Sequence, residues 1–108
     1  MEPKLTSYIT SKYASKSDMM YDETLWAEII EAMLPRFKEA GALSQVVPQV
    51  WNKEGSFILA NTWENVEEKA FVACQELFRE AEAELATRSE ISQIVTASRS
   101  IILRDVRL

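Results

Sequence analysis

The feature of this sequence that most constrains its fold is one broad apolar stripe with helical spacing. Its members recur at every third or fourth position: Leu25, Trp26, Ile29, Ile30, Met33, Leu34 and Phe37. This spacing predicts an amphipathic helix rather than a strand. Pro35 lies inside the pattern and is expected to kink or restart the helix, because proline lacks an N–H and crowds the carbonyl four residues back. Gly41 offers the left-handed position at which many helices end.

The residues before the stripe predict a strand and then a helix start. Leu5–Tyr13 is rich in Thr, Ser, Tyr and Ile and alternates in polarity, which is typical of a strand. The polar stretch 14–21 is expected to be irregular. Asp22, Glu23 and Thr24 place capping and acidic groups where a helix N-terminus can use them, so the helix is expected to begin there.

Two further strands are predicted after Gly41. Val46–Trp51 and Phe57–Trp63 are rich in β-forming residues, and the polar loop Asn52–Ser56 between them contains a glycine suited to a hairpin. Pro48 cannot donate a ladder hydrogen bond, which favours an edge position for the first of these two strands.

A second helix and a fourth strand complete the pattern. Asn65 and Glu68 resemble a capping box, and an apolar stripe follows: Ala70, Cys74, Leu77, Phe78, Ala81 and Leu85. The segment Ser89–Ser98 fits a short helix or turn, although Ile94, Val95 and Thr96 equally suit a strand; we favour the turn or helix. Ser100–Leu108 is then expected to be the fourth strand. The resulting order is βαββαβ.

In this order the two helices cover only one face of the sheet. The predicted strands look apolar on both faces, since Ile58 and Ala60 alternate with Phe57 and Leu59, and Val47 and Trp51 alternate with Val46 and Val50. The uncovered face therefore needs a second layer. For one domain spanning residues 1–108, the simplest second layer is the same face of another copy, related by a two-fold axis.

Composition excludes several partners. Seventeen acidic and twelve basic residues give a formal charge of −5, which disfavours nucleic acid, and Asp105 interrupts the small cluster Arg99, Arg104 and Arg107. The single cysteine, Cys74, cannot form an internal disulfide, and the N-terminus lacks the apolar stretch of a secretory signal. We therefore expect a cytoplasmic protein with no membrane association.

The length, the element order and the segment from Phe57 to Glu68 (FILANTWENVEE) carry a family resemblance. The chain resembles the dimeric α/β-barrel superfamily and, within it, the antibiotic-biosynthesis-monooxygenase-like domains. The resemblance implies an α+β, ferredoxin-like βαββαβ antiparallel sheet with two helices on one face, paired into a dimeric α/β barrel. The superfamily includes cofactor-independent oxygenases, haem-degrading enzymes and isomerases, so the resemblance alone does not choose an activity.

The absence of histidine removes many chemistries. The chain has no imidazole base, no histidine metal ligand and no Ser/His or Cys/His pair. Haem-degrading relatives hold iron through a histidine, so that activity is disfavoured. Two glycines cannot form a glycine-rich phosphate loop, and one cysteine cannot form a zinc cluster. We expect no cofactor and no metal.

The resemblance also implies the candidate catalytic residues Asn61, Trp63 and Tyr8. In oxygenases of this kind a strand asparagine and tryptophan line a pocket between sheet and helices, where the amide steadies a substrate oxyanion. The spacing of Asn61 and Trp63 departs from that of the catalytic members. The alternative interpretation is that Trp63 packs in the core or dimer interface and that Asn61 bonds to backbone.

Other residues carry weaker signals. Aromatic residues that line either a flat ligand cavity or the core are Trp26, Trp51, Phe71 and Phe78. Cys74 is expected to be a buried, inert thiol. Arg99 or Tyr8 is a candidate for binding an anionic group at a pocket mouth. Glu28 and Glu31 of the first helix and the glutamates of the second helix are expected to face solvent.

The sequence therefore predicts a cofactor-independent, monooxygenase-like or small-aromatic-ligand-binding homodimer. The alternative is a non-catalytic dimeric binding or regulatory module of unknown function.

Overall fold

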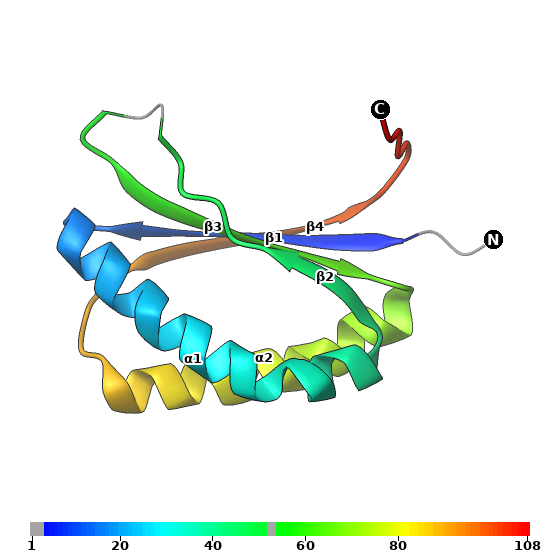
Figure 1. Cartoon of the computed structure of the whole chain (residues 1–108), viewed down its shortest axis with the longest axis horizontal. Coiled ribbons are helices and arrows are strands. Elements are labelled where there is room, and N and C mark those ends of the chain that lie inside the picture. The colour runs from blue at the N-terminus through cyan, green and yellow to red at the C-terminus, as the bar shows by residue number, and fades with distance from the viewer. Residues whose placement is uncertain (1–3, 52–53) are drawn as a thin grey trace.

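The computed structural model of the protein describes residues 4–51 and 54–108 and has the predicted βαββαβ order. Its elements are β1 (Leu5–Tyr13), α1 (Lys16–Ala40), β2 (Ala42–Val46), β3 (Phe57–Asn65), α2 (Glu68–Arg88) and β4 (Ile94–Ile101). The strands form one antiparallel sheet in the order β2-β3-β1-β4. Both helices lie on one face of this sheet, and the other face is open (Figure 1). The predicted ferredoxin-like α+β fold is confirmed.

The central pair β1 and β3 fixes which side chains face the helices. Ser7 lies opposite Trp63, and Tyr13 lies opposite Phe57. Side chains of directly opposite residues lie on the same face, and alternate residues of a strand share a face. The odd-numbered residues of β1 and β3 therefore face the helices, and the even-numbered residues face the open side.

Helix α1 begins six residues before the predicted start at Asp22. Ser15 is the N-cap, and its hydroxyl accepts a hydrogen bond from the Asp18 backbone N–H at 3.1 Å. The prediction of irregular structure over 14–21 is wrong, because Met19 extends the buried stripe by another turn. Asp22 is consequently a buried residue inside the helix rather than a residue at its start.

The C-terminal end of α1 follows the prediction more closely. The helix does not restart at Pro35, which lies on its exposed face, and runs as one element to Ala40. Gly41 then adopts φ 109°, the left-handed conformation expected of a helix-ending glycine. A side chain at Gly41 would meet the Ala70 side chain, since a built Cβ lies 2.5 Å from the Ala70 Cβ.

The second strand lies earlier than predicted. It is Ala42–Val46 rather than Val46–Trp51, because the backbone at Gly41 turns directly into pairing with β3 and the Val66 N–H donates to the Gly41 carbonyl at 3.0 Å. Residues 47–51 keep only an isolated bridge, Gln49 to Leu59. The edge position expected from Pro48 is confirmed for β2, which is an outer strand. Of the predicted hairpin loop, Asn52 and Lys53 lie outside the described residues.

The capping box predicted at Asn65 is wrong. Asn65 is the last residue of β3 and is 1% exposed, because it pairs with Leu5 in the ladder. The N-cap of α2 is Glu67, which makes no side-chain capping bond.

The fourth strand was also placed too late. Ile94–Ile101 pairs with β1, from Lys12 opposite Ile94 to Leu5 opposite Ile101, whereas 102–108 contains no strand. The prediction of a turn or short helix over 89–98 is wrong from Ile94 onward. All eight residues of this edge strand are exposed, so burial left no alternating pattern in the sequence from which its position could be inferred.

The open face of the sheet is less apolar than predicted. Val47 and Trp51 lie outside the strands, and β1 presents Thr6, Tyr8, Thr10 and Lys12 on this side. From β4 come Ile94 and three Thr or Ser side chains at 96, 98 and 100. Ile58 and Ala60 of β3 lie on this face as predicted, so it combines these apolar residues with the Thr and Ser side chains of β1 and β4.

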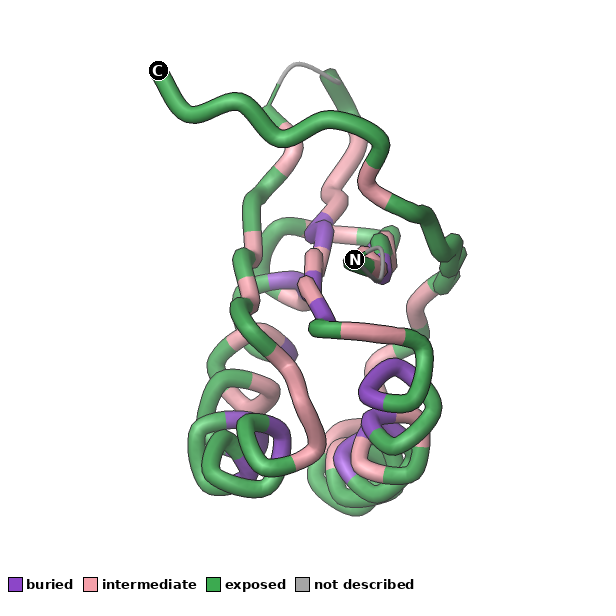
Figure 2. The backbone as a smooth tube through the Cα atoms, turned by 90° about the vertical axis from the view of Figure 1, so that its right-hand side faces the viewer, coloured by how far each residue is buried: buried purple, intermediate pink, exposed green. Residues whose placement is uncertain are grey.

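Buried residues gather between the helices and the sheet (Figure 2). The main cluster packs α1 and α2 against Trp63: Ile29, Ile30, Met33, Phe37, Cys74, Phe78 and Ala81. A smaller cluster joins Tyr13, Met19 and Leu59 at the other end of β1. Among the described residues, no helix is long and apolar enough to cross a bilayer.

Candidate functional site

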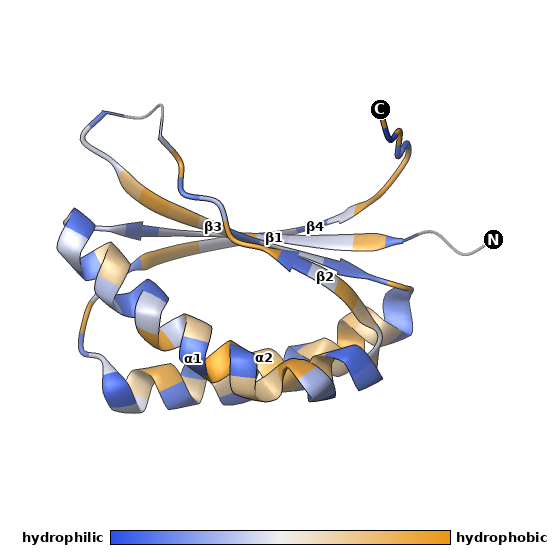
Figure 3. Cartoon of the chain, in the orientation of Figure 1, coloured by the Kyte–Doolittle hydropathy of each residue, from blue (hydrophilic) through white to orange (hydrophobic). Residues whose placement is uncertain are grey.

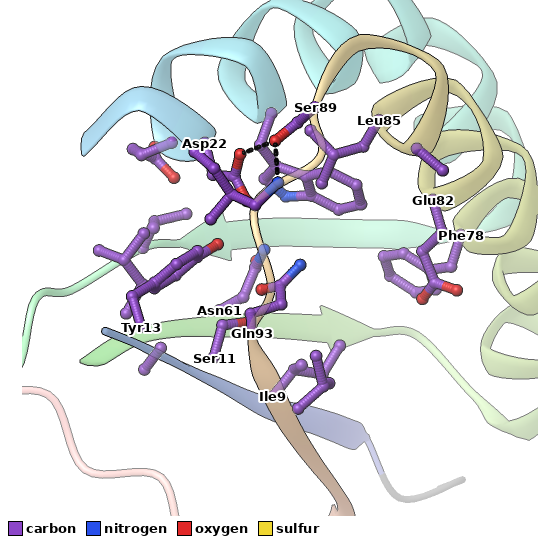
Figure 4. Close-up of a pocket in the computed structure, with 18 residues that line it drawn as sticks. Ile9, Ser11, Tyr13, Asp22, Asn61, Phe78, Glu82, Leu85, Ser89 and Gln93 are labelled. Carbon is purple, nitrogen blue, oxygen red and sulfur yellow. Dashed lines mark hydrogen bonds between the residues drawn. The ribbon is translucent and has the colours of Figure 1, made fainter. Parts of the chain in front are cut away.

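A cavity of about 400 Å³ lies between the sheet, the N-terminal half of α1 and the C-terminal end of α2. Figure 4 shows its side chains converging from the strands and both helices. The sheet contributes, among others, Ile9, Ser11, Tyr13, Leu59 and Asn61. The opposite wall comes from helices and the segment after α2, including Asp22, Trp26, Phe78, Glu82, Leu85 and Ser89.

A buried carboxylate holds one end of the cavity. Asp22 is 1% exposed, and its Oδ1 accepts a hydrogen bond from the Ser89 hydroxyl at 2.6 Å (Figure 4). The Ser89 Oγ in turn accepts from the Ile91 backbone N–H at 3.2 Å. This bridge ties α1 to the segment after α2. Burial, and next the charge of Asp22, raises the pKa of the Tyr13 phenol, so Tyr13 stays protonated.

Asn61 lies in the cavity wall, as the resemblance implied. Its Oδ1 accepts a hydrogen bond from the Gln45 Nε2 at 3.0 Å. The partner is therefore a side chain of β2 and not the backbone, which was the alternative interpretation. Because Oδ1 is held by Gln45, the two N–H donors of the Asn61 amide are directed by a side chain from a neighbouring strand.

Trp63, two residues further along β3, lies in the core. It is 1% exposed, and its ring lies 4.5 Å from that of Phe37 and 5.1 Å from that of Phe78, centroid to centroid. Trp63 is not among the residues that line the cavity, but Phe78 is. Trp63 thus contacts the Phe78 ring, which forms part of the cavity wall.

Tyr8 is separated from the other two candidates. It is 43% exposed on the open face of the sheet, whereas Asn61 and Trp63 face the helices. The structure brings Asn61 and Trp63 to the same side, and it does not bring Tyr8 into this cavity.

The four aromatic residues that the sequence offers for a ligand cavity or the core lie in three different regions of the structure. Trp26 and Phe78 line the cavity, whereas Trp51 is 90% exposed. Phe71 lies in a second hollow, of about 900 Å³, near the N-terminus of α2. There the Arg99 guanidinium lies 4.8 Å from the centroid of the Phe71 ring. The first hollow is the candidate site, because it gathers buried polar groups as well as aromatic walls.

The sequence did not reveal the acidic lining of the cavity. Glu82 of α2 is exposed, as expected for the glutamates of that helix, but it also lines the cavity together with Asp22 and Glu23 of α1. Burial raises the pKa of the Glu23 carboxyl. One available signal was the position of Asp22, three residues after Met19 and four before Trp26, within the apolar stripe.

Cys74 is not among the residues that line the cavity. It is fully buried, and burial raises the pKa of its thiol. Within residues 4–51 and 54–108, no group of three or more His, Cys, Asp or Glu side chains is placed to hold a metal ion.

Comparison with known proteins supports the fold. The sequence profile of a family described as "Domain of unknown function (DUF6974)" matches residues 2–102. No curated protein gives a significant sequence match.

Three solved structures are similar over nearly the whole chain. A dimeric ferredoxin-like protein from an uncultured marine organism is 24% identical, with TM-score 0.82, over 97% of this chain and 100% of its own. A second dimeric ferredoxin-like protein from an uncultured marine organism is 18% identical, with TM-score 0.86, over 97% and 99%. A monooxygenase from the ActVA-Orf6 gene of Streptomyces coelicolor, in complex with nanaomycin D, is 13% identical, with TM-score 0.67, over 98% and 92%. At these low identities the structural similarity shows a shared fold alone, and the resemblance inferred from the sequence is confirmed at that level.

Proposed function

Since the chain belongs to the DUF6974 family, whose description assigns no function, we propose from its own residues that it binds a small aromatic molecule in the helix–sheet cavity. In this proposal it acts as a homodimeric, monooxygenase-like protein that needs no cofactor. The observation that carries the proposal is a cavity of about 400 Å³ whose aromatic walls converge with fixed polar groups.

The size and lining of the cavity suit a small organic ligand. Ligand sites in proteins commonly enclose roughly 300–1,000 Å³ and combine apolar walls with a few oriented polar groups. Tyr13, Trp26 and Phe78 provide aromatic surface, and Leu59 and Leu85 provide aliphatic surface. A flat aromatic ring matches such walls better than a sugar or a phosphate ester does.

Asn61 is the residue we propose for polar contact with the ligand. Because Gln45 occupies its Oδ1, the Asn61 amide is held with its N–H groups available to a ligand oxygen. In oxygenation, electrons from an electron-rich substrate ring would reduce dioxygen, and an amide donor would stabilise negative charge on the ring oxygen. Trp63 supports this wall by packing edge-to-face against Phe78.

We propose that the second copy covers the open face of the sheet. Tyr8 and Val46 are exposed there, and the segment after β4 leaves the sheet on the same side, away from the helices (Figure 1). This segment begins with hydrophobic residues (Figure 3), and Leu103 is 95% exposed. Two similar structures are described as dimeric. Tyr8 thus belongs to the proposed dimer surface, and a cytoplasmic location stays a prediction.

A cavity-blocking variant tests the binding proposal. Ala86 and Ala83 are both exposed residues of α2, but only Ala86 is among the residues that line the cavity. In a thermal-shift screen of bicyclic and tricyclic phenols and amines, ligands should raise the melting temperature of the wild type and of Ala83→Phe, but not of Ala86→Phe. Oxygen consumption with each stabilising phenol then separates an oxygenase from a binding protein.

Light scattering tests the assembly. A dimer that binds none of these compounds would favour the non-catalytic dimeric module instead. A monomer would contradict the proposed pairing, because Tyr8 and Leu103 would then remain exposed to water.

A further inference from the structure

The candidate cavity has an acidic lining. Asp22 and Glu23 reach it from α1, and Glu82 reaches it from α2. The remaining described lining residues include neutral polar groups such as Ser11, Asn61 and Gln93 but no lysine or arginine. A site built for a carboxylate or phosphate would contain basic side chains or a helix N-terminus.

These carboxylates are not neutralised elsewhere in the described part of the chain. The ion pairs there use other acidic residues: Glu28, Glu64, Glu76, Glu80, Glu84 and Asp105. Asp22 is hydrogen-bonded to the Ser89 hydroxyl, which brings no positive charge. A bound cation would therefore face carboxylates that have no competing ion pair within residues 4–51 and 54–108.

Two further features of the site add to its negative potential. Leu85, Ala86 and Ser89 line the cavity where α2 ends, so the carbonyl end of that helix, which carries partial negative charge, lies beside it. The π faces of aromatic rings also attract cations, and Trp26 and Phe78 form part of the wall.

We propose that the ligand of this cavity is an amine: a flat aromatic body carrying a protonated amino group that is attracted by the carboxylates of the lining, Asp22, Glu23 and Glu82. This inference rests on the proposed function, since it names the chemical class of ligand for the same cavity. The amino group lies at the helix side and the aromatic body between Tyr13, Trp26 and Phe78, while Asn61 meets an oxygen of the ligand. Partial burial raises the pKa of the Glu23 carboxyl, and a cation bound beside it would favour its charged form.

Three probes that share one ring system test the inference. Naphthylmethylamine, naphthalenemethanol and naphthoate differ mainly in charge, and calorimetry at neutral pH gives the affinity of each for the full chain. The amine should bind about tenfold more tightly than the alcohol, and the carboxylate more weakly than both. Equal or tighter binding of the alcohol or carboxylate overturns the amine class but leaves the cavity as a binding site. No binding by any probe overturns both the inference and the proposed function.

Charge-neutralising variants locate the effect. Glu23→Gln and Glu82→Gln keep side-chain shape and should each lower amine affinity about three- to tenfold, while alcohol affinity stays within twofold. Glu76→Gln is the matched control, because Glu76 lies on α2 outside the cavity and pairs with Arg79 at 2.8 Å. If Glu76→Gln lowers amine affinity as much as the cavity variants, or if the preference survives Glu23→Gln combined with Glu82→Gln, the assignment to this cavity is wrong.

Discussion

Asn61 and Trp63 lie two residues apart on the same face of β3, yet their surroundings differ. Trp63 is enclosed by Phe37 and Phe78, with ring centroids 4.5 and 5.1 Å away. Asn61 borders a cavity of about 400 Å³ and is held by a side chain from the neighbouring strand. The same two helices cover both positions, so one sheet face carries a packed region and a hollow region.

The contrast arises from what the helices present above each position. Over Trp63, α1 presents Met33 and Phe37, which fill the space. Over Asn61 the wall includes Asp22, Trp26 and Glu82, and a cavity remains between these side chains and the sheet. Packing density dominates the energetics of the first region, and hydrogen bonding dominates the second. The variants below are chosen to separate the two contributions.

The largest effect is expected in the packed region. Trp63→Ala should lower the free energy of unfolding by about 3–5 kcal/mol, because it leaves a large cavity between two rings. Trp51→Ala is the control, since Trp51 is 90% exposed and its loss should change stability by less than about 0.5 kcal/mol. Urea unfolding measures both. Similar small changes for the two variants would contradict the distinction between packed and exposed tryptophans.

The buried carboxylate should give the next largest effect. Asp22→Ala removes the acceptor of the 2.6 Å bond from Ser89 and should cost about 2–3 kcal/mol of stability. Glu31→Ala, at an exposed position of the same helix, should have little effect. If Asp22→Ala is as stable as wild type in urea, the Asp22–Ser89 bridge does not hold the hollow end together.

The alkaline limit of stability should reveal Tyr13. Its pKa is raised above the ordinary value of 10.0, so the phenol stays protonated in the folded state at a pH where the unfolded chain loses the proton. The stability it contributes is complete below pH 10.0 and falls as pH rises further, by about 1.4 kcal/mol per unit.

Tyr13→Phe should remove this fall of the unfolding free energy with rising pH. Tyr21→Phe, at a position that is 53% exposed, should leave it in place. Unfolding free energies measured over the alkaline range give the difference. Parallel slopes for wild type and Tyr13→Phe would show that the phenol is not protected in the folded state.

The sequence predicted the packed region better than the hollow one. The stripes of α1 and α2 and the apolar β3 follow from periodicity, because burial on one face imposes it. Periodicity is absent from β4, an exposed edge strand, and its position was missed. The early start of α1 is hidden in the sequence because Ser15 and Asp18, which form its cap, lie in a polar stretch that is typical of a loop.

The candidate site was only partly accessible from the sequence. Asn61 was reached through family resemblance. The Asp22–Ser89 bridge joins residues far apart in the chain, so no local pattern signals it. Glu82 is exposed like the glutamates around it, and only the position of α2 over the sheet also places it in the cavity lining. Contacts between such distant residues depend on the tertiary structure, and no local sequence pattern shows which residues will meet.

The smallest effect on stability, and the sharpest test of the contrast, is expected from Asn61→Ala. It removes one partly buried bond, from Gln45 at 3.0 Å, and should cost no more than about 1 kcal/mol in urea unfolding. Affinity for a stabilising aromatic ligand should nevertheless fall about five- to tenfold, because the ligand oxygen loses its donor. Thr62→Ala, the adjacent position on the open face, should leave ligand affinity unchanged in the same calorimetric titration. If Asn61→Ala lowers stability strongly but leaves ligand affinity unchanged, Asn61 has a structural role like that of Trp63. The two positions would then differ only in how tightly they are packed.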